Sequence, residues 1–216
     1  MTNCLLRFSR GTSRAPFIIP ALVAGALFGT TLLGGCDQKP VLSFQNLDIT
    51  GNRQFADHFS LPDTNGQVRT VADYRGKIVV LVFGYTHCPD VCPETMARLM
   101  QVLAKLGPDA KQVRILFITV DPARDTPKAL HDYVGAFDAE HARGLTGTDS
   151  QIEALAKRYR VAYQMEKRDP SGNYDVTHSS AVYVFDAEGR ARLLATDSDT
   201  PDQIAQDLRR IIETTS

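Results

Sequence analysis

The sequence is almost without net charge: its 216 residues hold 24 basic against 25 acidic side chains, a formal charge of −1 at pH 7. Without a basic excess there is no surface to neutralise phosphates, so nucleic-acid binding is not expected. Internal repeats and low-complexity tracts are also absent from the sequence. A composition of 43% hydrophobic and 23% charged residues is typical of one globular domain with a short appendage.

The first 35 residues predict an export signal. Arg7, Arg10 and Arg14 precede an uncharged, mostly apolar run over 15–33, without any acidic residue. Small residues then lead to Cys36, a pattern that resembles a bacterial lipobox, in which the thiol is lipidated. The alternative is an uncleaved anchor helix, because the run is close to the ~20 residues that span a bilayer. Both alternatives hold the rest of the chain outside the cytoplasm.

These features divide the chain into three expected parts. We expect a signal peptide over 1–35, a membrane tether over 36–54 and a folded domain over 55–216. The acidic Asp37 directly after the lipobox cysteine resembles an inner-membrane retention signal. The expected location is therefore the periplasmic face of the bacterial inner membrane, with a lipid or an N-terminal anchor.

Strand and helix patterns alternate through the domain. Continuous apolar, β-rich runs predict buried strands, and apolar residues at helical spacing after Pro or Thr predict helices. Asn65-Gly66 predicts a type I′ turn in a first hairpin. The expected elements, in chain order, are a hairpin over 59–70, a strand over 77–85, a helix over 93–106, a strand over 113–120, helices over 126–137 and 149–159, a strand over 161–166, a hairpin over 181–196 and a helix over 201–212.

This order is that of a thioredoxin-like α/β fold. The N-terminal hairpin is one addition to it, and the polar, turn-rich stretch 167–173 predicts a surface hairpin insertion as a second. In such a fold a pair of reactive cysteines follows the first core strand and lies at the N-terminus of the next helix. In this sequence that position holds Cys88 and Cys92. Helix N-termini stabilise thiolates and lower the pKa of cysteine.

Only two thiols remain for the domain, because Cys4 lies in the signal and Cys36 in the lipobox. Cys88 and Cys92 are four positions apart, so on a helix both sulfurs share one face and can meet one ion or each other. A purely structural disulfide would close a very short ring and stabilise little. A thiol–disulfide oxidoreductase fits the location and the disulfide-permissive compartment. However, general oxidoreductases of this fold use Cys-x-x-Cys and a proline before the facing strand, and 176–180 contains no proline.

His178 occupies that neighbourhood instead, which favours a metal site. Two thiolates and one imidazole form a soft, low-coordinate set that suits Cu(I). Structural zinc requires a fourth protein ligand that the domain does not offer, whereas catalytic zinc with three ligands stays open. The remaining histidines and two methionines are interpreted as non-ligands. His87 is at most a modulator of the thiol pKa, and the expected surface residues are His58, His131 and His141. The expected core residues are Met96 and Met100.

Four ordered motifs resemble those of the Sco/SenC family. They are FGYTHCPDVCP at 83–93, TVDPARDTP at 119–127, GLTG at 144–147 and the stretch 174–179, within a similarity that extends from about Phe55 to the end. The resemblance implies a thioredoxin fold with copper, as Cu(I) and also Cu(II), bound by Cys88, Cys92 and His178. One departure is Thr177, where the family usually has an acidic residue.

The resemblance also implies a task, the assembly of the binuclear CuA centre in subunit II of cytochrome c oxidase. Two functions remain open. One is an extracytoplasmic copper metallochaperone with thiol redox chemistry at Cys88 and Cys92. The other is a copper-independent thiol–disulfide reductase that keeps the CuA-site cysteines reduced, so whether the chain is an enzyme stays undecided. Another copper chaperone or a thiol reductant is a further expected partner.

Two aspartates follow the second core strand. Asp121 lies at the carboxyl end of that strand, where active sites of such sheets gather, and there it could influence thiol protonation. The alternative is structural: Asp121-Pro122 ends the strand, and Asp125 caps the next helix. We retain Asp121 as a candidate catalytic residue.

Overall fold

The longest apolar runs of the sequence form the centre of a six-stranded sheet in the computed structural model, which describes residues 43–55 and 59–215. Strand β4 (Ile78–Gly84) is buried at every position, and β5 (Val113–Thr119) pairs with it in parallel. The strand order is β1-β10-β9-β4-β5-β6. The remaining members are β1 (Leu47–Asp48), β6 (Ala142–Leu145), β9 (Val182–Phe185) and β10 (Ala191–Ala195).

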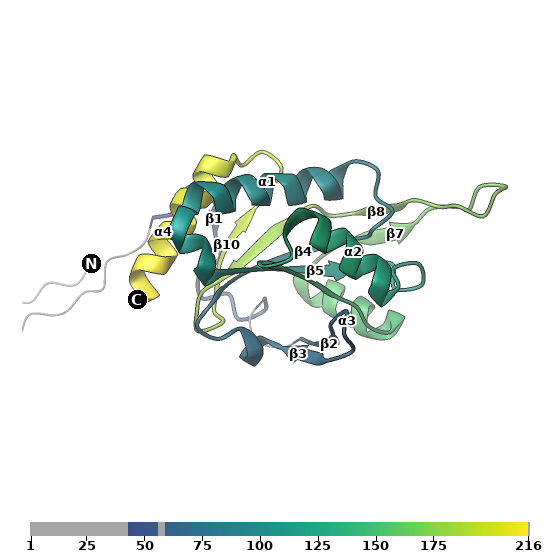
Figure 1. Cartoon of the computed structure of the whole chain (residues 1–216), viewed down its shortest axis with the longest axis horizontal. Coiled ribbons are helices and arrows are strands. Elements are labelled where there is room, and N and C mark those ends of the chain that lie inside the picture. Colours follow the sequence, from purple (N-terminus) through teal and green to yellow (C-terminus); the bar gives the residue numbers. More distant parts are fainter. Residues whose placement is uncertain (1–42, 56–58, 216) are drawn as a thin grey trace, which may run out of the picture. The chain divides into compact units, whose positions relative to one another are not determined.

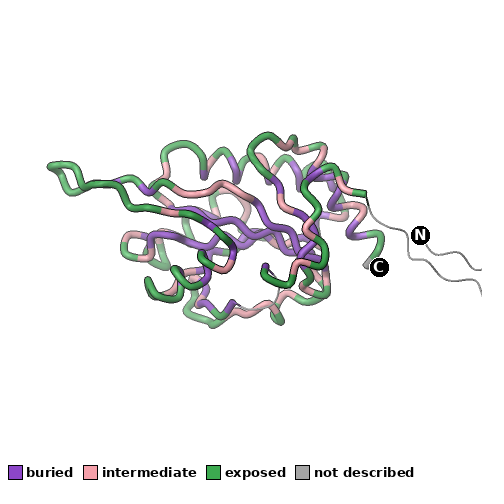
Figure 2. The backbone as a smooth tube through the Cα atoms, turned by 180° about the vertical axis from the view of Figure 1, so that it is seen from behind, coloured by how far each residue is buried: buried purple, intermediate pink, exposed green. Residues whose placement is uncertain are grey.

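Four α-helices are described: α1 (Val91–Leu106), α2 (Pro127–Asp138), α3 (Asp149–Tyr159) and α4 (Pro201–Thr215). Helix α1 packs against α4 and α2, and Figure 1 shows α1 and α4 above the sheet and α3 with the small β2–β3 hairpin below it. Two short 3₁₀ helices, Val71–Tyr74 and Gly107–Gln112, connect elements. Figure 2 shows the buried residues concentrated along the sheet strands.

Helices α2 and α3 each begin directly after a threonine, for the same physical reason. The first amides of a helix have no partner within it, and a threonine hydroxyl can accept one of them. Thr126 accepts the Ala129 amide hydrogen at 3.2 Å, and Thr148 accepts that of Gln151 at 3.3 Å. The Gln151 side chain returns a bond to the Thr148 amide, which completes a capping box.

The expected thioredoxin-like α/β architecture is confirmed, with local corrections. Strand β1 lies within the range expected as a tether and pairs with β10 at the edge of the sheet. The N-terminal hairpin forms from β2 (Ser60–Pro62) and β3 (Val68–Thr70). Its turn is not type I′, because Gly66 has a positive φ of 78° but Asn65 does not. Gly66 instead ends a three-residue loop.

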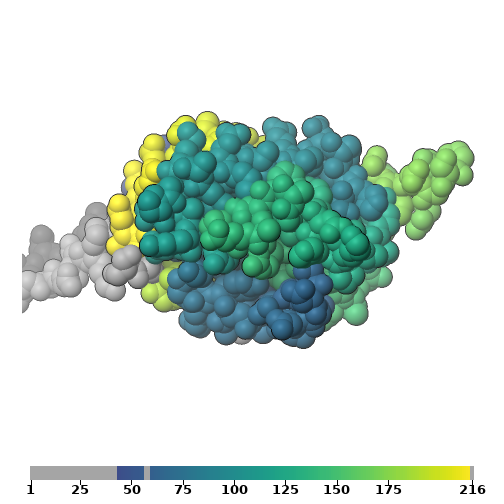
Figure 3. All heavy atoms as spheres, viewed as in Figure 1, coloured from purple at the N-terminus to yellow at the C-terminus, as the bar shows by residue number. Residues whose placement is uncertain are grey.

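The surface insertion forms a separate hairpin that carries His178. Strand β7 (Tyr163–Met165) pairs antiparallel with β8 (Val176–His178), outside the six-stranded sheet. Residues 164–173 are all exposed, and Figures 1 and 3 show the hairpin projecting beyond α2 and α3. The strand β8 and the strand β6 were both absent from the sequence expectation.

No helix in the described part of the chain is long and apolar enough to cross a membrane. The expected signal peptide, Cys4, the lipidation site Cys36 and His58 lie outside the described residues.

Candidate metal centre

The two cysteines lie at the junction between β4 and α1. Helix α1 begins at Val91, so Cys92 is in its first turn, whereas Cys88 precedes the helix. The expectation that both sulfurs share a helix face is therefore corrected: Pro89 disfavours a helical conformation at the residue before it. Cys88 still meets the helix, because its Sγ accepts the Cys92 amide hydrogen at 3.4 Å.

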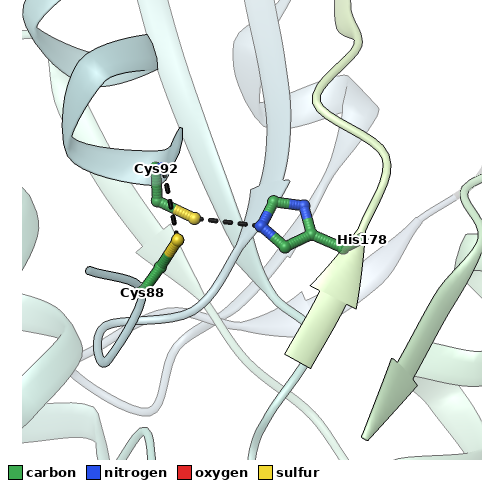
Figure 4. Close-up of side chains that lie close together, drawn as sticks. All are labelled: Cys88, Cys92 and His178. Carbon is green, nitrogen blue, oxygen red and sulfur yellow. Dashed lines mark hydrogen bonds between the residues drawn. The ribbon is translucent and has the colours of Figure 1, made fainter. Parts of the chain in front are cut away.

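The structure brings Cys88, Cys92 and His178 together as one ligand group. Their two sulfurs and one ring nitrogen all lie within 4.8 Å of one another, and Cys92 Sγ is 3.1 Å from His178 Nε2 (Figure 4). His178 Nδ1 is 3.0 Å from the Ser179 carbonyl oxygen. That carbonyl can only accept, so Nδ1 carries the hydrogen and Nε2 presents its lone pair to the sulfurs.

The electrostatic state of the dithiol follows from burial. Cys92 is 3% exposed, whereas Cys88 is half-buried, and both are free thiols. Burial raises the pKa of Cys92 far above its ordinary value. The helix-terminus argument alone would have lowered this pKa, but here desolvation outweighs it. Without a metal, Cys92 therefore holds its proton, and a metal ion that binds there must displace it.

The donor set fits a soft metal ion. Two thiols and an imidazole nitrogen converge, and the second imidazole nitrogen is fixed by a backbone carbonyl, as in many metal sites. A small pocket adjoins Cys92 and His178, with Thr95 and Ser180 in its lining. Gly84 at the end of β4 leaves room for Cys92, because a Cβ there would lie 2.8 Å from Cys92 Sγ.

Asp121 lies near the hairpin rather than among the ligands. Its buried carboxylate forms an ion pair with Arg124 and accepts the Tyr174 hydroxyl hydrogen at 2.9 Å. Arg124 also donates to the Tyr174 carbonyl at 2.7 Å, and its guanidinium lies 3.6 Å from the centre of the Tyr174 ring. These contacts connect the loop after β5 to the strand that leads to His178.

Asp125 contacts the loop that leads to Cys88. It is 1% exposed and accepts hydrogen bonds from the Thr86 amide at 3.0 Å and from the hydroxyls of Thr86 and Thr119, both at 2.6 Å. The alternative in which Asp125 caps α2 is wrong, because the cap is Thr126. The Asp125 carboxylate therefore joins the loop before Cys88, through Thr86, to the end of β5, through Thr119.

The other candidates lie outside the ligand group. The His87 side chain is exposed, 3.6 Å from Asp125. His131 is exposed, as expected, but His141 is mostly buried and pairs with Asp138 at 2.8 Å, which corrects its interpretation as a surface residue. Both methionines pack with the core, Met96 fully and Met100 partly buried. Thr177 donates to Glu166 on the exposed outer side of the hairpin.

Sequence reasoning missed Tyr85, a buried residue that contacts both halves of the site. Its carbonyl accepts the Cys88 amide hydrogen at 3.3 Å, and its hydroxyl accepts the Val176 amide hydrogen at 3.2 Å. The partners are 91 residues apart in the latter bond, so local pattern carries no signal for it. The apolar run that ends at Tyr85 only indicated core packing.

Comparisons with known proteins find relatives over most of the described domain. The family model described as SCO1/SenC matches residues 48–213. The protein SCO2 homolog, mitochondrial, of Bos taurus is 38% identical, with 91% of this chain and 75% of the relative covered. Its counterpart in Mus musculus is 42% identical over 71% of this chain, which spans 61% of that relative's length.

A solved structure from the same comparisons has a fold similar to that of this chain. The crystal structure of Arabidopsis thaliana ScoI with copper bound is 32% identical, has a TM-score of 0.68, and covers 74% of this chain and 99% of its own. The family model extends over most of the described domain, including Cys88, Cys92 and His178. The chain therefore belongs to the SCO1/SenC family.

Proposed function

We propose that this chain is an extracytoplasmic copper metallochaperone with thiol redox chemistry. Copper is its cargo, bound by Cys88, Cys92 and His178. The observation that carries the proposal is the convergence of two sulfurs and an imidazole nitrogen within 4.8 Å. That set prefers Cu(I), and the copper-bound ScoI structure of a relative supports the choice of metal. Cu(II) is a second accepted form.

The redox state of the dithiol controls the cargo in this proposal. Only reduced cysteines offer two thiolates, and copper moves to the partner by ligand exchange onto its thiolates. Formation of the Cys88–Cys92 disulfide withdraws two electrons from the two thiolates and removes both soft donors, so the metal is released. The acceptor of those electrons is a thiol–disulfide partner of the chain.

The experiment is a copper titration of the reduced domain. Wild type should bind one Cu(I) per chain, the Cys88→Ser, Cys92→Ser double variant none, and His178→Ala more weakly than wild type. Stoichiometric binding that survives in the double variant would overturn the proposal. The matched control is Met100→Leu, a partly buried methionine within α1 that should change nothing.

A copper-independent thiol–disulfide reductase is the second candidate. It is supported by the free, half-buried Cys88, which a partner disulfide can reach, while Cys92 lies buried behind it. This function predicts that His178→Ala retains thiol-exchange activity and cell function. A deletion strain separates the two: restoration of CuA by added copper supports delivery, and failure of added copper supports reduction.

The partner and the cellular address belong to the same proposal. We propose subunit II of cytochrome c oxidase as the copper acceptor, with another copper chaperone or a thiol reductant upstream. The lipobox at Cys36 and the arginines before it support attachment to the periplasmic face of the inner membrane. Cys36→Ala, followed by fractionation of membranes and periplasm, tests the lipid anchor.

We propose Asp121 as a positioning residue for His178. Its support is the pair of contacts to Arg124 and to the Tyr174 hydroxyl, which hold the start of the hairpin's second strand. Asp121→Asn keeps the shape but removes the charge that pairs with Arg124. Weaker copper binding by Asp121→Asn with unchanged thiol-exchange rates supports this role, whereas an altered thiol-exchange rate supports the alternative effect on thiol protonation.

A further inference from the structure

The third metal ligand lies on an element that the main sheet does not hold. Strands β7 and β8 pair only with each other, and three residues of each form the ladder. A two-stranded hairpin is marginally stable by itself in water. The distance between His178 and the dithiol therefore depends on side-chain contacts between this hairpin and the body of the domain.

Tyr85 makes such a contact directly beside the ligand. It follows β4 and is 2% exposed. Its hydroxyl accepts the amide hydrogen of Val176, two residues before His178 on β8. Its ring also meets the imidazole of His178 edge to face, with ring centres 5.9 Å apart and an angle of 86° between the planes. Tyr85 thus fixes both the backbone of β8 and the orientation of the ligand ring.

The same residue is tied to the dithiol. The Tyr85 carbonyl accepts the amide hydrogen of Cys88, so one residue joins the cysteine loop and the histidine strand. Water cannot easily replace the Tyr85 hydroxyl as the acceptor of the Val176 amide hydrogen, because Val176 is only 3% exposed. Without Tyr85 that buried amide would lose its hydrogen-bond partner.

We propose that the Tyr85 hydroxyl is a positioning element for copper binding, which holds His178 at ligand distance from Cys88 and Cys92. The inference rests on the proposed ligand set. A protein that holds its ligands ready before the metal arrives loses less free energy in ordering them. Tyr85 does not touch the metal in this account; it acts through β8 and the His178 ring.

The test is Tyr85→Phe, which removes one oxygen atom and retains the ring. We expect Cu(I) affinity, measured by competition with a chromophoric chelator, to fall about tenfold, a change that corresponds to about 1.4 kcal/mol. Tyr183→Phe is the matched control: its buried hydroxyl donates to a backbone carbonyl at 2.6 Å in the core, away from the ligands. That variant should lower the melting temperature and leave copper affinity unchanged.

A double-mutant cycle shows whether the effect passes through His178. In the His178→Ala background, Tyr85→Phe should cost no further affinity, since the ligand it positions is gone. In the Cu(II)-loaded Tyr85→Phe variant, the nitrogen hyperfine pattern in the electron paramagnetic resonance spectrum should weaken or broaden.

Two outcomes would overturn the inference. One is a Tyr85→Phe affinity equal to that of Tyr183→Phe; the other is an equal loss with and without His178. Failure of the proposed function is a different result, because it would appear as wild-type affinity in His178→Ala itself.

Discussion

Gly84 leaves no room for a side chain next to the candidate site. An added Cβ would lie 2.8 Å from both Cys92 Sγ and the Phe117 ring, where ordinary contact begins at 3.4 Å. Neither neighbour has free space, since Cys92 is 3% and Phe117 1% exposed. Gly84→Ala must therefore displace the sulfur, the ring or the β4 backbone. Overpacking of this kind costs about 1–3 kcal/mol.

The same displacement should reach the ligand group. Cys92 Sγ is 3.1 Å from His178 Nε2, so a shift of the sulfur by several tenths of an ångström changes the donor geometry. We expect Gly84→Ala to lower both the unfolding free energy in urea and the Cu(I) affinity. Gly135→Ala in α2 is the control: an added Cβ there meets no atom within 4 Å apart from its chain neighbours and the backbone of its own helix, and a helical Ala gains about 0.5–1 kcal/mol over Gly. Wild-type stability and affinity in Gly84→Ala would refute the reasoning.

Three further predictions concern pH, reactivity and order. Burial opposes ionisation of Asp63, but hydrogen bonds from Arg69 and two backbone amides outweigh it and lower its pKa below 3.8. The ionised carboxylate stabilises the fold fully above that value, and this stabilisation is lost as pH falls through the folded-state pKa. The free energy of unfolding in urea should therefore decline less below about pH 4 in Asp63→Asn than in wild type. Iodoacetamide should alkylate Cys88 before Cys92, because Cys92 is buried with a raised pKa; mass spectrometry that finds the reverse order contradicts this. Copper should slow amide hydrogen exchange over 163–178 in wild type, and His178→Ala should abolish that protection.

Much of the fold could be predicted because its signals are local. The run 78–83 is long, β-rich and apolar, and it is the buried strand β4. Thr148 with Gln151 three positions later is a complete capping signal for α3. Helix α1 is also expected from the sequence, although it begins at Val91 rather than at Pro93 and so includes Cys92.

The missed elements lack local signals for physical reasons. Strand β6 has four residues and includes Arg143 and Gly144, so neither an apolar run nor an alternation marks it; pairing with β5 creates it. Strand β1 likewise depends on β10. The type I′ turn expected at Asn65-Gly66 does not form. The side chain of Asp63 accepts the amide hydrogens of Asn65 and Gln67 and stabilises a longer loop.

The candidate site likewise has one part that local sequence predicts and one part that it does not. Spacing in the sequence predicts that Cys88 and Cys92 can meet, since both belong to one short segment. It cannot place His178, whose distance to them depends on a hairpin outside the main sheet. Tyr85 supplies the missing relation, because it contacts the cysteine loop through its carbonyl and the histidine strand through its hydroxyl. The candidate ligand set is therefore divided between the β4–α1 junction and a separate hairpin, and Tyr85 contacts both of these parts of the fold.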